Sequence, residues 1–221
     1  AARLGGGTWS TSGKPWWQMA AESFVPWSGA PSEVTQYGDV SIRPAYAEFV
    51  GADAYVSIHA NASGSSSNGG TANGLSTYRY SCNDYADHSR SDLATGCDDP
   101  PGSKRLLEAA HASMLRRVRG TWDANFGDRL GRVANFGELR TLDGIPGILV
   151  ETAFFDNIAS PAGSPPPKMA DNKALHDPRF RESIALGLAE GLAEYFGSTT
   201  RLPLRPDVLF ARNQRDGTVR L

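Results

Sequence analysis

Two apolar runs in this chain each end on a single polar side chain. The run Tyr55–Ile58 leads to His59, and residues 64–74 beyond it are mostly Gly, Ser, Asn and Thr. The run Ile148–Val150 leads in the same way to Glu151. β-branched and aromatic residues favour strands, and both runs therefore predict a strand that gives way to a loop near its polar residue. Ligands of open α/β sheets bind at the carboxyl ends of strands, so we expect His59 and Glu151 to face one pocket.

The rest of the chain predicts helices alternating with strands. Apolar periodicity and helix-end residues predict four helices, over residues 15–24, 39–50, 103–120 and 177–197. Pro44 is expected to interrupt the second helix. Ser103 is the expected N-cap of the third helix and Asp177 the expected cap of the fourth. A further strand is expected at 75–80, and a short strand or loop over 128–140 should deliver Glu138 and Arg140 towards the pocket. This order predicts an α/β fold, a three-layer αβα sandwich around a mostly parallel sheet.

Composition narrows the possible partners. The chain has 221 residues and a net charge of −2, with Lys and Arg scattered, so nothing indicates binding to nucleic acid. No apolar run reaches the roughly 20 residues that a membrane helix needs. Trp16, Trp17 and Trp27 are interpreted as packing residues in preference to a sugar platform. His111 lies on the apolar stripe of its helix, which favours a core or boundary histidine over a ligand.

Two cysteines, Cys82 and Cys97, bound a polar stretch with no core of its own. A disulfide between them is the preferred interpretation, and it would be worth about 3 kcal/mol by loop-closure entropy. Two unrelated thiols remain an alternative. A zinc knuckle is less favoured, because only His88 lies between the two cysteines.

One histidine and one carboxylate at two strand ends suggest metal-assisted hydrolysis. Each residue also has a purely structural alternative. Glu151 could be a buried carboxylate paired with an arginine such as Arg140. His59 could be a hydrogen-bonded histidine at a strand end, with no role in binding or catalysis.

Three motifs resemble a known family. They are VSIHANAS at Val56–Ser63 with the preceding Arg43 and residues 51–53, ILVETAFFDN at Ile148–Asn157, and the closing helix at 177–197. Together they resemble the zinc-dependent N-acetylmuramoyl-L-alanine amidases of the type-3 group, which cut peptidoglycan. The resemblance implies cleavage of the amide between N-acetylmuramic acid and the L-alanine of the stem peptide by zinc-activated water. It implies Zn²⁺ as cofactor, His59 as a zinc ligand and Glu151 as the catalytic glutamate. Asn61 and Arg140 could position substrate or stabilise the oxyanion.

The chain departs from the family at its beginning. No histidine precedes His59, and the family's first motif, a His-Gly-Gly strand end followed by a helix with a glutamate ligand, is absent from this sequence. The resemblance therefore implies that a second His and a Glu ligand lie before Ala1. Residues 1–197 are then an N-terminally incomplete amidase domain lacking its first strand and helix. Residues 198–221 resemble a linker and the opening of a fibronectin type III-like module.

Two alternatives to the amidase remain open. One is a non-catalytic cell-wall-binding module that kept the amidase fold, and the other is a zinc peptidase or deacylase acting on a different amide. For the amidase, the implied substrate is peptidoglycan and the implied location is extracytoplasmic, either periplasmic or secreted. Whether a regulatory protein or an adjoining domain controls the site is left open by the sequence.

Overall fold

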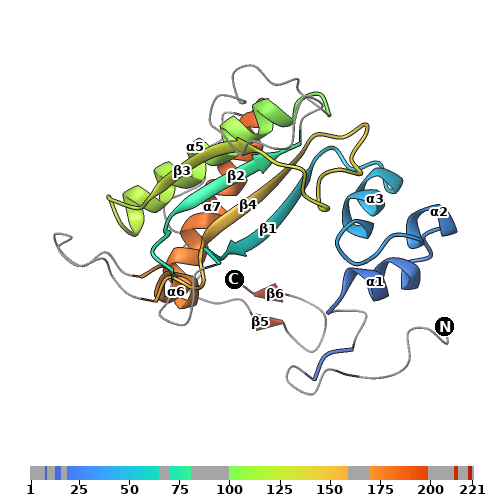
Figure 1. The fold of residues 1–221 in the computed structure, drawn as a ribbon, viewed down its shortest axis with the longest axis horizontal. Coiled ribbons are helices and arrows are strands. Elements are labelled where there is room, and N and C mark those ends of the chain that lie inside the picture. Colours follow the sequence, from blue (N-terminus) through green and yellow to red (C-terminus); the bar gives the residue numbers. More distant parts are fainter. Residues whose placement is uncertain are drawn as a thin grey trace.

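The computed structural model describes residues 8, 13–15, 19–64, 70–80, 100–158 and 170–198, together with the backbone of 212–213 and 219–220. Its centre is a four-stranded sheet (Figure 1). The strands are β1 (Tyr55–Asn61), β2 (Leu75–Arg79), β3 (Asp128–Val133) and β4 (Gly147–Phe154). The predictions for Trp16, Trp17, His88 and the pairing of Cys82 with Cys97 lie outside the described residues.

The strand order in the sheet is β1-β4-β2-β3. β1 pairs with β4 and β2 pairs with β3 in parallel, whereas β2 and β4 are antiparallel. The predicted α/β fold with a mostly parallel sheet is therefore confirmed. Because β1 and β4 run in the same direction, their carboxyl ends meet at one end of the sheet, as the strand-end argument requires.

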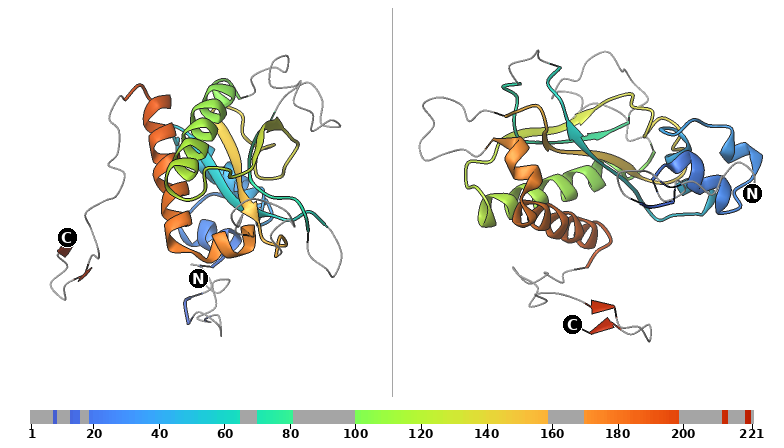
Figure 2. Two further views of the ribbon diagram at one scale, coloured as in Figure 1. Left: turned by 90° about the vertical axis from the view of Figure 1, so that its left-hand side faces the viewer. Right: turned by 90° about the horizontal axis from the view of Figure 1, so that it is seen from below.

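Helices α5 (Ser103–Thr121) and α7 (Pro178–Tyr195) lie side by side on one face of the sheet (Figure 2). Leu106, Met114 and Phe180 pack there against Ile148 and Val150 of β4, and all five are buried. The two helices approach closely where α7 carries glycines. A Cβ on Gly187 would stand 2.5 Å from the Cα of Met114, and one on Gly191 would stand 2.5 Å from the Cα of Ala110.

The opposite face of the sheet is covered by the irregular segment that follows β3. Leu139 and Leu142 of this segment pack on Tyr78 and Leu149. The helices α1 (Ala21–Trp27), α2 (Ser32–Thr35) and α3 (Ile42–Phe49) gather beyond one end of the sheet (Figures 1 and 2). Glu48 of α3 holds the segment in place, because its Oε1 accepts the backbone N–H groups of Asp143, Gly144 and Ile145 at 2.8 to 3.1 Å.

Several predicted helix boundaries are wrong. The first helix begins at Ala21 and not at residue 15, and Trp27 at its end is half exposed. Pro44 does not interrupt α3, because it lies in the first turn, where a backbone N–H has no intrahelical partner to lose. The short helices α2 and α6 (Asp171–His176) have too few turns to show periodicity, and the sequence did not predict them.

The predicted helix caps have mixed outcomes. Asp177 caps α7 as predicted, since its carboxylate accepts the N–H of Arg179 at 2.9 Å. Ser103 is not the N-cap of α5, because Gly102 takes that place with φ of 94°. The Ser103 hydroxyl oxygen instead accepts the N–H of Gly147 at 3.0 Å, which ties the start of α5 to the start of β4.

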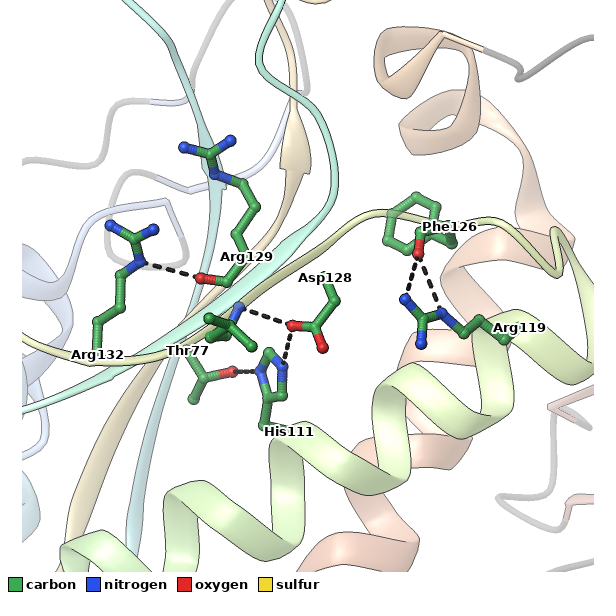
Figure 3. A network of polar contacts seen from close by, with 8 residues as sticks. Thr77, His111, Arg119, Phe126, Asp128, Arg129 and Arg132 are labelled. Carbon is green, nitrogen blue, oxygen red and sulfur yellow. Dashed lines mark hydrogen bonds and ion pairs between the residues drawn. The ribbon is translucent and has the colours of Figure 1, made fainter. Parts of the chain in front are cut away.

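His111 is a hydrogen-bonded core histidine, as predicted. Its Nδ1 lies 3.0 Å from the Thr77 hydroxyl and its Nε2 lies 3.1 Å from Oδ1 of Asp128 (Figure 3). The same Asp128 oxygen accepts the N–H of Leu130, whose φ is 69°. A neutral imidazole that donates from Nε2 to the carboxylate and accepts the Thr77 proton at Nδ1 satisfies both contacts. The network joins α5 to β2 and β3.

Two predictions about the whole chain are only partly addressed by the structure. None of the described helices is long and apolar enough to span a membrane. The division at residues 197 and 198 stays a prediction, although Arg212–Asn213 and Val219–Arg220 form a short antiparallel pair, β5 and β6.

Protonation of His111 should make stability depend on pH. Burial lowers the pKa of His111 below its ordinary 6.5, outweighing the opposing effect of Asp128. The unfolded chain therefore takes up this proton at a higher pH than the folded chain, so stability is lost as the pH falls below about 6.5. We expect His111→Gln to cost about 1 to 3 kcal/mol at pH 8 and to flatten this slope in urea unfolding. His176→Gln, at an exposed position, is the control, and an unchanged slope in His111→Gln would contradict the assignment.

The close contact of α5 and α7 gives a second prediction. Gly187→Ala places a methyl group 2.5 Å from a backbone atom, so the helices must separate, at a cost of about 1 to 3 kcal/mol. Gly120→Ala in α5 meets no atom within 4 Å and should be neutral or stabilising by up to about 1 kcal/mol. The melting temperature and the free energy of unfolding in urea should fall for Gly187→Ala and should stay the same or rise for Gly120→Ala. Equal changes in the two variants would contradict the close packing of α5 against α7.

Candidate active site

His59 and Glu151 are direct neighbours across the sheet. They are register partners in the parallel pairing of β1 with β4, and Ser76 of β2 pairs with Glu151 from the other side. Alternation along β4 places Leu149 and Glu151 on one face and Ile148 and Val150 on the other. Ile148 and Val150 pack under α5 and α7, so Glu151 lies on the face covered by the segment after β3.

The His59 imidazole is held between a serine and a glutamate. Its Nε2 lies 2.9 Å from the hydroxyl oxygen of Ser57, two residues earlier on the same strand face. The same nitrogen lies 3.5 Å from Oε1 of Glu138, which the segment after β3 brings to the site. The prediction that residues 128–140 deliver Glu138 here is confirmed. Ser57 was not predicted, although its position two residues before His59 places it on the same face.

Glu151 is a partly buried carboxylate with an oxygen that has no partner. Its Oε2 is buried and makes no hydrogen bond, and the same holds for the hydroxyl oxygen of its neighbour Ser76. Burial, and secondarily the nearby negative charge of Glu138, raise the pKa of Glu151 to about 7. A carboxyl group with this pKa can both take up and release a proton near neutral pH, which is what general acid–base catalysis requires.

The other two predicted site residues make local contacts. Oδ1 of Asn61 accepts the N–H of Ala62 at 2.8 Å, so this oxygen stabilises the turn that follows β1. Arg140 is exposed, and its guanidinium donates to the backbone carbonyl of Asn135 at 3.1 Å. Within the described residues Arg140 forms no ion pair with Glu151. The structural alternative for Glu151, a buried pair with this arginine, is therefore not what the structure shows.

The loop after β1 is fastened to the end of β4. Oδ2 of Asp156 accepts both the N–H and the hydroxyl of Ser63, at 2.8 and 2.6 Å. The backbone N–H of Gly70 donates to the carbonyl of Asp156 at 2.7 Å, and a Cβ on Gly70 would collide with the Ser63 hydroxyl. Ser63, Gly70 and Asp156 therefore connect the two strand ends that carry His59 and Glu151.

Comparison with protein families decides the class of this chain. A family model described as N-acetylmuramoyl-L-alanine amidase matches residues 30–194, which include β1, β4 and both core helices. The chain belongs to this amidase family. The resemblance noted in the sequence is confirmed, and the family supports amidase activity on peptidoglycan.

Two solved structures have the same fold. The catalytic domain of CwlV, an N-acetylmuramoyl-L-alanine amidase from Bacillus (Paenibacillus) polymyxa var. colistinus, is 23% identical with a TM-score of 0.51, covering 83% of this chain and 82% of that chain. An N-acetylmuramoyl-L-alanine amidase from Clostridium difficile 630 is 21% identical with a TM-score of 0.50, covering 88% and 91%. A comparison with curated proteins finds no match.

Type-3 amidases are generally zinc enzymes, and the donors around His59 fit such an ion in part. An imidazole nitrogen and a carboxylate oxygen are ordinary zinc ligands, and here they stand 3.5 Å apart. Among the described residues, however, no group of three or more His, Cys, Asp or Glu side chains is arranged to hold a metal ion. The described part of the chain therefore places only two such donors close together, and it does not fit a catalytic zinc, which takes three protein ligands.

The environment of Glu151 predicts a stability effect that depends on pH. Its pKa is about 7 in the folded chain and near the ordinary 4.5 when unfolded, so the folded chain holds this proton more tightly. Stability is therefore lost as the pH rises from about 4.5 to 7. Gln cannot ionise, and Glu151→Gln in metal-free buffer should gain more stability relative to the native chain at pH 8 than at pH 4.5. Urea unfolding at both pH values measures this, and equal differences would contradict the raised pKa.

Proposed function

We propose that this amidase hydrolyses the bond between N-acetylmuramic acid and the L-alanine of the stem peptide in peptidoglycan. The observation that carries the proposal is the pairing of His59 with Glu151 at adjacent strand ends, with the Glu151 carboxyl titrating near neutral pH. The family description supports the choice of bond. Glu151 is proposed as the catalytic residue and His59 as a metal ligand.

Amide hydrolysis needs a proton to be moved twice. An amide carbonyl is a poor electrophile and its nitrogen is a poor leaving group unless it is protonated. Glu151 as carboxylate takes a proton from the attacking water, whose oxygen bonds to the lactyl carbonyl carbon of the muramic acid. Glu151 as carboxylic acid then gives that proton to the alanine nitrogen as the C–N bond breaks. The products are a free carboxyl group on the sugar and a free amine on the peptide.

His59 and its partners prepare the site for this step. The Ser57 hydroxyl oxygen lies 2.9 Å from Nε2 of the imidazole, and the packed segment after β3 covers this face of the sheet. Zinc bound at His59 would polarise the amide carbonyl and supply a more acidic water. Asn61 and Arg140 are proposed to contact substrate, Asn61 from the end of β1 and Arg140 from the exposed side of the segment after β3.

The substrate sets the proposed location. Peptidoglycan lies outside the cytoplasm, so we place the protein in the periplasm or among secreted proteins. A disulfide between Cys82 and Cys97 belongs to the same proposal, because such bonds persist in oxidising compartments. The proposed domain division is an amidase domain over residues 1–197 and a linker with the opening of a fibronectin type III-like module over 198–221.

Replacement of Glu151 tests the reaction. Glu151→Gln keeps the size of the side chain but cannot move the proton, so the rate of sacculus solubilisation should fall by about 10²- to 10⁴-fold. The zinc content of the variant, measured on the same sample, should stay at the level of the native chain. Glu182→Gln, an exposed glutamate of α7, should retain full activity.

Product analysis distinguishes the bond. New amino termini on L-alanine together with peptide-free muramic acid support the proposal. Cleavage within the stem peptide would indicate a peptidase, and release of acetate would indicate a deacylase. Binding of sacculi by the native chain without any release, at every zinc concentration tried, would favour the wall-binding module instead.

A further inference from the structure

Strand β3 contains a bulge beside the candidate active site. Between Asp128 and Gly131, β3 carries one residue more than the facing stretch of β2. Leu130 lies in this bulge with φ of 69°, and it is the only residue other than glycine with a positive φ in the described part of the chain. Oδ1 of Asp128 stabilises it, because this oxygen accepts the Leu130 N–H at 2.7 Å and also contacts His111. Bulges change the direction of neighbouring side chains and are frequent beside active sites.

Two arginines at this bulge, Arg129 and Arg132, point away from helix α5 (Figure 3). The guanidinium carbon of Arg129 lies 5.0 Å from the centre of the Phe154 ring. The Nε–H of Arg132 donates to the backbone carbonyl of Arg129 at 3.0 Å. Arg129 is partly buried, and it forms no ion pair with a carboxylate of the described residues. Two cationic side chains are therefore held together on the face of the sheet opposite α5.

The Phe154 ring lies on the same face as Glu151. Side chains of residues that are paired across two strands project to the same face, and β1 pairs His59 with Glu151 and Asn61 with Phe154. Because His59 and Asn61 are two positions apart on β1, they also share a face. Phe154 follows Glu151 by three positions of β4, which is roughly 10 Å of strand. The arginine on the Phe154 ring therefore stands on the site face, within reach of a short peptide bound at Glu151.

A carboxylate two or three residues from the reacting amide fits this arrangement. An extended peptide covers about 3.3 to 3.6 Å per residue, so a chain with its scissile amide at Glu151 reaches the Phe154 ring with its second or third residue. Guanidinium groups bind carboxylates through paired, charge-assisted hydrogen bonds. Glu138 and Glu151 bring negative charge to the other part of this face and disfavour a carboxylate there. The charges therefore favour one direction for a bound acidic peptide.

We propose that Arg129 and Arg132 bind a free carboxylate of the peptidoglycan stem peptide and so select acidic over amidated stem peptides. The proposal rests on the proposed function in one respect, the placement of the scissile amide at Glu151. Neither arginine belongs to the site residues that the sequence predicted. An amidated stem peptide brings no negative charge to Arg129, so it should bind more weakly than the acid.

Binding of two muramoyl dipeptides to the metal-free full chain tests this without relying on hydrolysis. N-acetylmuramoyl-L-alanyl-D-glutamate and its diamide are each titrated into chelator-treated, dialysed protein by calorimetry. We expect the native chain to bind the acid about 10- to 100-fold more tightly than the diamide. Arg129→Gln should remove most of this preference without changing the affinity for the diamide. Arg129→Lys keeps the charge but not the paired hydrogen bonds, so it should retain part of the preference.

The chain offers a matched control in Arg105. Its guanidinium carbon also lies over an aromatic ring, 4.5 Å from the centre of Tyr195, but Arg105 is exposed on α5, on the other side of the sheet. Arg105→Gln should therefore bind both dipeptides like the native chain. Arg132→Gln should lower the preference for the acid as Arg129→Gln does. Circular dichroism and urea unfolding of each variant show that the fold is retained.

Each result decides the proposal. Equal affinity of the native chain for the two dipeptides, or no binding of either, would overturn it. An undiminished preference in Arg129→Gln would overturn it as well, and so would an equal loss in Arg105→Gln, which would reflect net charge alone.

The proposed function fails separately. If the native chain prefers the acid through Arg129 but releases no stem peptides from sacculi, the carboxylate site stands and the reaction does not. If it releases stem peptides and binds the acid and the diamide equally, the reaction stands and the carboxylate site does not.

Discussion

The register of β1 against β4 is the constraint on which the site depends. A slip of one residue would turn the side chains of one strand to the opposite face, and His59 and Glu151 would then no longer lie together. Burial fixes this register. Ile148 and Val150 fill the core beneath α5 and α7, while Leu149 fills the second core under the segment after β3. The alternation that satisfies both cores leaves Glu151 beside His59, so the position of the carboxylate follows from the packing of its apolar neighbours.

The segment after β3 converts this pair into a cluster of three. It has no regular structure beyond its turns, and contacts far away in the sequence hold it. Glu48 of α3 binds the N–H of Asp143 across 95 positions, and a Cβ on Gly137 would stand 2.7 Å from Val40. Helix α3 therefore helps to place Glu138 without reaching His59 itself. Substitutions that destabilise helices α1 to α3 should therefore displace the segment after β3 and change the position of Glu138.

Sequence patterns predicted correctly those features that depend on residues close together in the chain. The two strand ends, the cap at Asp177 and the core histidine His111 all follow from side chains close in sequence or from one helix face. Pro44 was misjudged because its effect depends on its place in the turn, and α2 and α6 are too short for periodicity. The sequence predicted that residues 128–140 bring Glu138 to the pocket, but it could not predict which atom of the site Glu138 approaches, because that depends on the packing of Leu139 against the sheet. Asn61 and Arg140 show the same limit, since a strand end or a loop fixes where a residue lies but not which partner its side chain takes.

Two buried oxygen atoms of this cluster have no hydrogen-bond partner, which lowers the folding stability of the protein. The hydroxyl oxygen of Ser76 and Oε2 of Glu151 are buried without partners, and donors placed near them would stabilise the fold. A donor at Glu151 would also hold the carboxylate in its charged form and lower its pKa, so that it could no longer exchange a proton near neutral pH. His59, by contrast, has the hydroxyl oxygen of Ser57 2.9 Å from its Nε2. The structure thus gives His59 a hydrogen-bonding neighbour and leaves an oxygen of Glu151 without one, which is the arrangement that the proposed proton transfer by Glu151 requires.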